Sequence, residues 1–115
     1  VIAGTTDHIT PWKAVYQTAR LYGDKTTFIL SNSGHLQSLL NPPGNPKAWY
    51  VKGVASEKDP DAWTTKASKH EGSWWADWAE FLKARSGDEI ETPKAAGSKK
   101  HKALGPAPGT YVFEP

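Results

Sequence analysis

The fold is decided by residues 1–31, which read VIAGTTDHITPWKAVYQTARLYGDKTTFILS. The first four residues, Val1-Ile2-Ala3-Gly4, have the apolar character of the end of a buried strand. Residues 26–31 contain the continuous run Phe28-Ile29-Leu30, which is typical of a strand covered on both faces. We therefore expect a strand at each end of this stretch. Because a natural domain seldom begins inside a strand, the first residues also indicate a cut through a larger protein.

A helix is expected between the two strands. Thr10 is a good N-cap residue, and Pro11 suits the first helical position. Apolar residues then recur at the i, i+3, i+4 and i+7 spacing of one helix face: Trp12, Val15, Tyr16 and Ala19. Gly23 is placed to end the helix. A strand–helix–strand unit predicts parallel neighbouring strands and an α/β fold.

The middle of the chain predicts one more strand and two more helices. Residues 48–51 have the character of a short strand. Asp59 and Pro60 can begin a short helix that continues to about Ser68. Ser73 can cap a second helix that ends before Gly87. The broad apolar face expected on this second helix carries Trp74, Trp75, Trp78, Phe81, Leu82 and Arg85.

The organisation of the chain changes at residue 88. Apolar periodicity disappears there, and Lys residues mix with Gly and Pro, which is typical of a linker. Residues 105–113 regain apolar character, and we expect them to dock as an extended strand. Residues 1–87 are thus expected to form the folded part, and residues 88–115 a linker-like tail.

The composition excludes several classes of function. The chain has 115 residues, enough for one small domain, and 14 Lys+Arg against 12 Asp+Glu give a net charge of +2. This charge is too small to indicate nucleic acid as a partner. Without any Cys, these residues cannot form a disulfide, a zinc–thiolate site or a cysteine nucleophile. No apolar run is long enough for a transmembrane segment.

Two polar residues follow the two predicted parallel strands. Asp7 comes after the first strand and His35 after the second, so both are expected at the same edge of the sheet, where catalytic groups of α/β folds gather. The carboxylate could accept a hydrogen bond from one imidazole nitrogen and leave the other nitrogen as a general base. The acid-before-histidine order matches α/β-hydrolases, whose nucleophile lies further upstream. The simpler interpretation is a capping Asp7 and an ordinary loop His35.

Other residues support weaker hypotheses. A metal site of Asp7, His8 and His35 lacks a tight ligand spacing. Ser31 and Ser33 lie close to His35 but have no Gly-x-Ser-x-Gly turn around them. The tryptophans can form either a carbohydrate- or peptide-binding platform or a packed helix face. The basic cluster in residues 99–102 can bind an anion or form a solvated tail.

Several long motifs resemble the polyhydroxyalkanoate synthases. Residues 4–12, GTTDHITPW, are similar to the family's Gly-x-x-Asp-His-Ile-x-Pro-Trp segment, and residues 31–38, SNSGHLQS, to its Ser-Gly-His segment. Residues 41–47, 71–78 and 105–112 continue the resemblance, so that it covers nearly the whole chain. It is weakest over residues 88–103.

The resemblance implies the C-terminal part of an α/β-hydrolase-type catalytic domain with a Cys–His–Asp triad. Such an acyltransferase polymerises (R)-3-hydroxyacyl-CoA into storage polyester and releases CoA, with no further cofactor and no metal. His35 would be the general base for the cysteine thiol. Asp7 would either orient His35 or help to activate the hydroxyl of the incoming monomer. The family also implies a homodimer in the bacterial cytoplasm, associated with polyester granules.

The chain departs from the family pattern because the cysteine and its Gly-x-Cys-x-Gly turn are absent. We therefore expect the isolated chain to be inactive. Without the rest of its sheet, it is also expected to self-associate or to loosen. Two alternatives remain open: a hydrolase or depolymerase on the same fold, and a granule- or protein-interaction module with a Trp-rich face.

Overall fold

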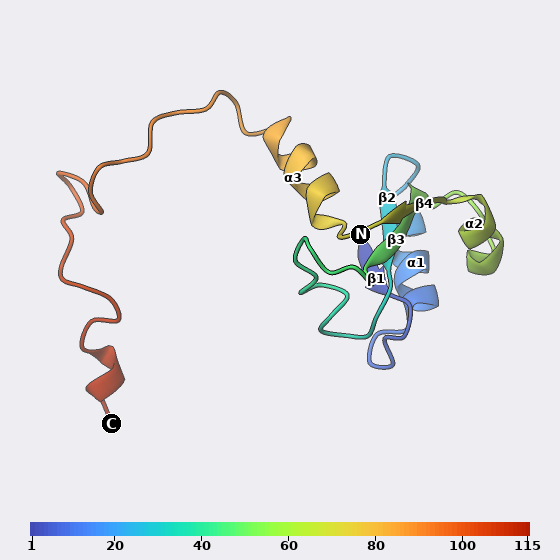
Figure 1. The fold of residues 1–115 in the computed structure, drawn as a ribbon, viewed down its shortest axis with the longest axis horizontal. Coiled ribbons are helices and arrows are strands. Elements are labelled where there is room, and N and C mark those ends of the chain that lie inside the picture. The colour runs from blue at the N-terminus through green and yellow to red at the C-terminus, as the bar shows by residue number, and fades with distance from the viewer.

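The computed structural model describes residues 1–115 and shows a mixed α/β fold with a four-stranded sheet (Figure 1). The sheet order is β1-β2-β3-β4, in which β1 and β2 are parallel and the other pairs are antiparallel. The elements in chain order are β1 (Ile2–Gly4), α1 (Trp12–Leu21), β2 (Thr27–Ser31), β3 (Trp49–Val54), α2 (Pro60–Lys66), β4 (Ser68–Glu71), α3 (Trp75–Lys83) and the 3-10 helix η1 (Tyr111–Phe113).

The strand–helix–strand unit at the N-terminus is confirmed. Ile2 pairs with Ile29 in parallel register, and α1 connects the two strands. The helix ends where predicted, because Gly23 adopts a φ of 93° that other residues rarely take. The predicted N-cap is wrong. Thr10 directs its hydroxyl to Asp7 instead, and Pro11 precedes the helix without any side-chain cap.

Three aromatic side chains form the centre of the core. Tyr16 of α1, Phe28 of β2 and Trp63 of α2 are each at most 2% exposed. Their ring centroids lie 5.1 to 5.4 Å apart, with the edge-on or tilted geometry that aromatic rings prefer. Both helices therefore pack on the sheet face that carries Phe28. On the opposite face of β2, Ile29 is half-buried and Ser31 is fully buried, so the predicted cover on both faces is only partly complete at Ile29.

The second half of the sheet differs from the expectation. Residues 48–51 were expected as a short strand, and the observed β3 continues to Val54 and pairs antiparallel with β2. Asp59 caps α2 as predicted, because its side chain accepts a hydrogen bond from the Asp61 amide. The helix ends at Lys66, and β4 follows it at once, where no strand was predicted. Every residue of Ser68–Glu71 is polar, so hydrophobic alternation gave no sign of this edge strand.

The Trp-rich helix is shorter and more exposed than predicted. Ser73 does accept a hydrogen bond from the Trp75 amide, as the expected cap would, but α3 ends at Lys83. Trp74, just before the helix, is buried, whereas Trp78 and Phe81 are each 45% exposed. Lys52 of β3 forms an ion pair of 2.5 Å with Asp77, which ties α3 to the sheet face opposite the core.

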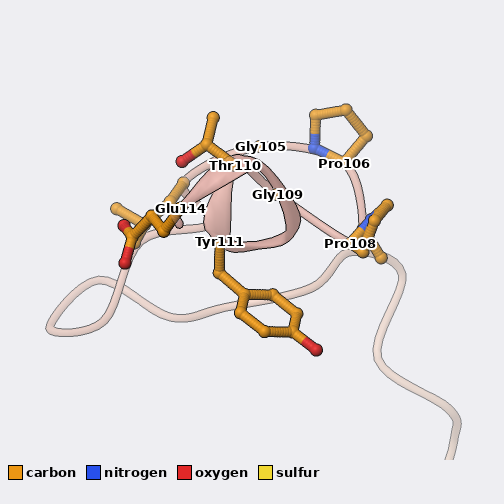
Figure 2. Close-up of a pocket in the computed structure, with 9 residues that line it drawn as sticks. Gly105, Pro106, Pro108, Gly109, Thr110, Tyr111 and Glu114 are labelled. Atoms are coloured by element: carbon orange, nitrogen blue, oxygen red, sulfur yellow. The ribbon is translucent and has the colours of Figure 1, made fainter.

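The tail runs away from the folded part (Figure 1). All residues from Phe81 onward are exposed, and the radius of gyration is 19.3 Å, against about 13 Å for a compact chain of this length. The predicted docked strand is wrong, because residues 111–113 form the 3-10 helix η1. Figure 2 shows a hollow lined only by residues of the segment 104–114, so the tail surrounds it without help from the sheet. None of the helices is long and apolar enough to cross a membrane.

Candidate active site

Asp7 and His35 meet at the edge where the two parallel strands end. Asp7 lies three residues after β1, and His35 lies four residues after β2. The Nδ1 atom of His35 is 2.8 Å from Oδ2 of Asp7. The structure thus brings together the two residues that the sequence singled out, although they are 28 positions apart. Parallel pairing is the cause, because it places both carboxyl ends at one edge.

The carboxylate of Asp7 is held by the turn that contains it. Its Oδ1 atom accepts hydrogen bonds of 2.9 Å from the amides of Ile9 and Thr10. Its Oδ2 atom accepts one of 2.7 Å from the Thr10 hydroxyl, in addition to the contact with His35. The hydrogen bond from the Thr10 amide is the main cause that holds the pKa of Asp7 far below its ordinary value, and the other donors add to it against the effect of burial. Asp7 is therefore ionised at neutral pH.

This ionised carboxylate fixes the tautomer of His35. A carboxylate only accepts hydrogen bonds, so Nδ1 of His35 must carry the proton that lies between the two groups. In the neutral imidazole, Nε2 then has a free lone pair. The side chain of His35 is 40% exposed, and that of Asp7 only 6%. The arrangement presents a basic nitrogen to an open surface and keeps the carboxylate behind it.

A hollow of about 430 Å³ lies beside the imidazole. Its lining residues are His8, Ile9, Gly34, His35, Leu36 and Gln37. They come from the two turns that follow β1 and β2, so the hollow is built by the same sheet edge as the Asp7–His35 pair. Because His35 is one of the lining residues, the hollow is open space next to its side chain.

Close packing under the site fixes the two turns against each other. A Cβ atom at Gly4 would lie 2.6 Å from the Ser33 carbonyl oxygen and 2.8 Å from Cβ of Ser38, so only glycine fits there. Ser33 itself has a φ of 91°, which is rare for a residue with a side chain. Strain of this kind, two residues before His35, is typical of functional sites.

The other candidate residues take no part in the pair. His8 is exposed and makes no hydrogen bond, and no group of three His, Cys, Asp or Glu side chains is arranged to hold a metal. Ser31 is fully buried, and its hydroxyl is directed to the Asn32 carbonyl, which leaves it unsuited to be a nucleophile. The basic cluster at residues 99–102 lies in the exposed tail, where Gly97 and Lys102 form an isolated bridge.

Sequence reasoning missed the residues that support the site from outside the two turns. The indole N–H of Trp74 donates to the Ser38 carbonyl at 2.8 Å, and that of Trp75 to the Leu39 carbonyl at 2.9 Å. The hydroxyl of Ser73 donates to the Asn41 carbonyl. These bonds span 32 to 36 positions, and no local pattern could have revealed them. The apolar tryptophan pattern indicated only a packed face.

By its fold and site, the chain is a mixed α/β protein with an Asp–His pair at the carboxyl edge of parallel strands. No family model matches it. It is 50% identical over 113 residues to Poly(3-hydroxyalkanoate) polymerase 1 and 52% identical over 113 residues to polymerase 2, both of Ectopseudomonas oleovorans. It is 38% identical over 106 residues to the poly(3-hydroxyalkanoate) polymerase subunit PhaC of Cupriavidus necator.

These matches cover 98%, 97% and 92% of this chain, but only 20%, 20% and 18% of the relatives. The resemblance found in the sequence is therefore confirmed, and the chain corresponds to a segment of the poly(3-hydroxyalkanoate) polymerases. It spans about a fifth of the length of the curated relatives that it matches.

Proposed function

We propose that this chain is the C-terminal part of the α/β-hydrolase-type catalytic domain of a poly(3-hydroxyalkanoate) polymerase. In that enzyme it would supply the His and the Asp of a Cys–His–Asp triad. The observation that carries the proposal is the hydrogen bond of 2.8 Å between His35 and Asp7. It occurs in a segment that is 50% identical to polymerase 1 of E. oleovorans.

His35 would act as the general base for a cysteine thiol from the rest of the domain. Nε2 takes the thiol proton, and the thiolate attacks the thioester carbonyl of (R)-3-hydroxyacyl-CoA. A free thiol with a pKa of about 8.5 is mostly protonated at neutral pH, so a base beside it raises the reactive fraction. The C–S bond to CoA breaks, and the leaving thiolate takes the proton back from Nε2. The acyl group is then bound to the cysteine.

Chain growth would use the same nitrogen. Nε2 takes the proton of a 3-hydroxyl group as its oxygen attacks the acyl–cysteine thioester, and an ester bond replaces the thioester bond. The cysteine thiolate leaves and is protonated from the imidazolium. The thioester of CoA is the substrate in this scheme, and neither a resident cofactor nor a metal is required.

The geometry favours an orienting role for Asp7 over direct activation of the monomer hydroxyl. Its two oxygens already accept four hydrogen bonds, from the Ile9 amide, the Thr10 amide, the Thr10 hydroxyl and His35. Its side chain is only 6% exposed. An incoming hydroxyl would have to displace one of these donors, whereas Nε2 of His35 requires no displacement.

The isolated chain is expected to be inactive, because it has no Cys to form the covalent intermediate. Its partners in the complete enzyme would be the remaining part of the domain, a second copy in a homodimer and the growing polyester. The enzyme would lie in the cytoplasm at the surface of polyester granules.

A chimera tests the proposal. This segment replaces the matching segment of polymerase 1 of E. oleovorans, and CoA release from (R)-3-hydroxyacyl-CoA is measured. We expect His35→Gln and Asp7→Asn each to lower kcat by at least about 100-fold, as loss of acid–base catalysis does. The control variant is His101→Gln, which alters an exposed tail histidine and should leave kcat unchanged. A fully active and folded His35→Gln chimera would refute the assignment.

One observation favours a second candidate, an interaction module. An apolar groove of about 480 Å³ is lined entirely by Leu39, Trp74, Trp75, Trp78, Ala79 and Leu82. The double variant Trp78→Ala/Leu82→Ala separates the two functions, because both side chains are more than 40% exposed and distant from the core. Loss of binding to polyester granules with an intact fold would support the module. Unchanged granule binding would leave the groove without this role.

A further inference from the structure

We propose that Trp74 is a positioning residue for His35, and that Trp75 assists it. The two indole N–H groups would hold the turn that carries the imidazole, so that Nδ1 of His35 stays within hydrogen-bond distance of Asp7. The proposal deepens the function above and rests on it, because it takes His35 as the general base. It assigns a polar task to side chains whose pattern indicates only apolar packing.

The contacts between residues 73–75, where α3 begins, and the turn after β2 are polar and specific. Trp74 is 7% exposed, and its Nε1 donates to the Ser38 carbonyl at 2.8 Å. Trp75 donates from Nε1 to the Leu39 carbonyl at 2.9 Å. Ser73 completes the set with a hydrogen bond from its hydroxyl to the Asn41 carbonyl, while the same oxygen receives the Trp75 amide at 3.0 Å. Three consecutive residues thus bind three carbonyls within four residues.

Ser38 transmits this anchoring to His35. Its amide donates to the Gly34 carbonyl at 3.0 Å, which closes the turn around the imidazole. Its hydroxyl lies 3.4 Å from the His35 carbonyl oxygen. Ser38 is 2% exposed and packs against Gly4 at the end of β1. A displacement of Ser38 would therefore move the backbone of His35 relative to the turn of Asp7.

The two members of the pair differ in how they are held. Asp7 is fixed by three hydrogen bonds from Ile9 and Thr10, which are residues of its own turn. The His35 ring has one hydrogen bond, to Asp7, and its orientation otherwise depends on the backbone. Catalytic geometry tolerates errors well below 1 Å, so a base on a loop requires external support. The N-terminus of α3 supplies that support.

The test compares Trp74→Phe with Trp63→Phe as a matched control. Trp63 is 2% exposed, and its Nε1 also donates to a backbone carbonyl, that of Val54, at 2.9 Å. Both substitutions remove one buried indole donor and keep an aromatic ring, but Trp63 lies in the core, where its ring contacts Tyr16 and Phe28. The two variants are therefore matched in the hydrogen bond that they lose and in the ring that they keep. A difference between them in the behaviour of His35 would then reflect the position of Trp74.

The first measurement, made in the same chimera, is the exchange rate of the His35 Nδ1–H proton with water, followed by NMR with ¹⁵N-labelled histidine. We expect Trp74→Phe to raise this rate about threefold to tenfold, as loss of one hydrogen bond allows, and Trp63→Phe to leave it unchanged. In the chimera, Trp74→Phe should lower kcat by a similar factor with KM unchanged, at a temperature where both variants are folded. Trp75→Phe, whose hydrogen bond lies at the surface, should show a smaller effect of the same sign without a folding defect.

The outcomes separate this proposal from the proposed function. If Trp74→Phe and Trp75→Phe leave both the exchange rate and kcat at the level of Trp63→Phe, the tryptophans only pack and the positioning role is refuted. If the exchange rate rises but His35→Gln retains full polymerase activity, the positioning link is supported and the general-base assignment fails. A rise in exchange together with a loss of kcat, and an inactive His35→Gln, supports both.

Discussion

Gly4→Ala is the substitution that tests most directly how the site is built. The added Cβ would lie 2.6 Å from the Ser33 carbonyl oxygen, 2.8 Å from Cβ of Ser38 and 2.9 Å from Oγ of Ser38. The Ser33 carbonyl oxygen belongs to the backbone, and Cβ of Ser38 is bonded directly to it. Neither atom can move aside by a change of rotamer. The turn that carries His35 must shift away from β1, or the strand must bend.

The magnitude follows from overpacking and from chain entropy. Forcing an extra methyl group into a closely packed site costs about 1–3 kcal/mol. Replacing Gly by Ala recovers about 0.4–1 kcal/mol by restricting the unfolded chain. The difference between these two contributions centres on about 1.3 kcal/mol in the free energy of unfolding, which corresponds to a fall in Tm of about 5–10 °C for a domain of this size.

Thermal and urea unfolding followed by circular dichroism provide the assay, with Gly34→Ala as the matched control. Gly34 is one residue before His35, but a Cβ there would lie 3.6 Å from its nearest neighbour, the Thr6 carbonyl oxygen. We expect Gly34→Ala to keep or slightly raise the stability. A Gly4→Ala variant as stable as the parent, or a Gly34→Ala variant equally destabilised, would show that the contact between β1 and the His35 turn is not as close as described.

Three further predictions concern the charge, the core and the tail. The pKa of Asp7 is lower in the folded state than its unfolded value of about 3.9, so the ionised carboxylate stabilises the fold fully above that pH. This stabilisation is lost as the pH falls through the folded pKa. The urea midpoints of the parent and of Asp7→Asn should therefore converge on acidification, and a constant difference would contradict this. Phe28→Ala removes the ring that contacts Tyr16 and Trp63 and should cost about 3–5 kcal/mol in urea unfolding, and Phe28→Leu, which keeps a larger apolar side chain, should cost less. Removal of residues 88–115 should leave the Tm unchanged within about 2 °C, since every residue of the tail is exposed; a large fall would mean that the tail packs on the folded part.

Local patterns were sufficient for the first part of the fold. The apolar spacing at Trp12, Val15, Tyr16 and Ala19 predicted α1, and Gly23 predicted its end. The parallel pairing of β1 and β2 followed from the helix between them, and with it the meeting of Asp7 and His35 at one edge. Each of these inferences needs only short-range spacing and the geometry of a strand–helix–strand unit.

Other elements depended on partners far away in the sequence. The polar segment Ser68–Glu71 forms a strand because it pairs with β3. Nothing in the local sequence of the segment indicates this pairing. Thr10 had the features of an N-cap, but its hydroxyl donates to the carboxylate of Asp7 and does not cap the helix. The apolar end of the tail, residues 111–113, found no strand to pair with and formed a local 3-10 helix.

The sequence alone determined the class of fold, the Asp7–His35 pair and the relationship to the polymerases, because periodicity and contiguous motifs are properties of the chain itself. Only the tertiary structure decided the tautomer of His35, the closeness of Gly4 to Ser38 and the link from Trp74 to the His35 turn. Those features depend on distances between residues about 28 to 36 positions apart. Packing sets such distances, and no local preference of the chain encodes them.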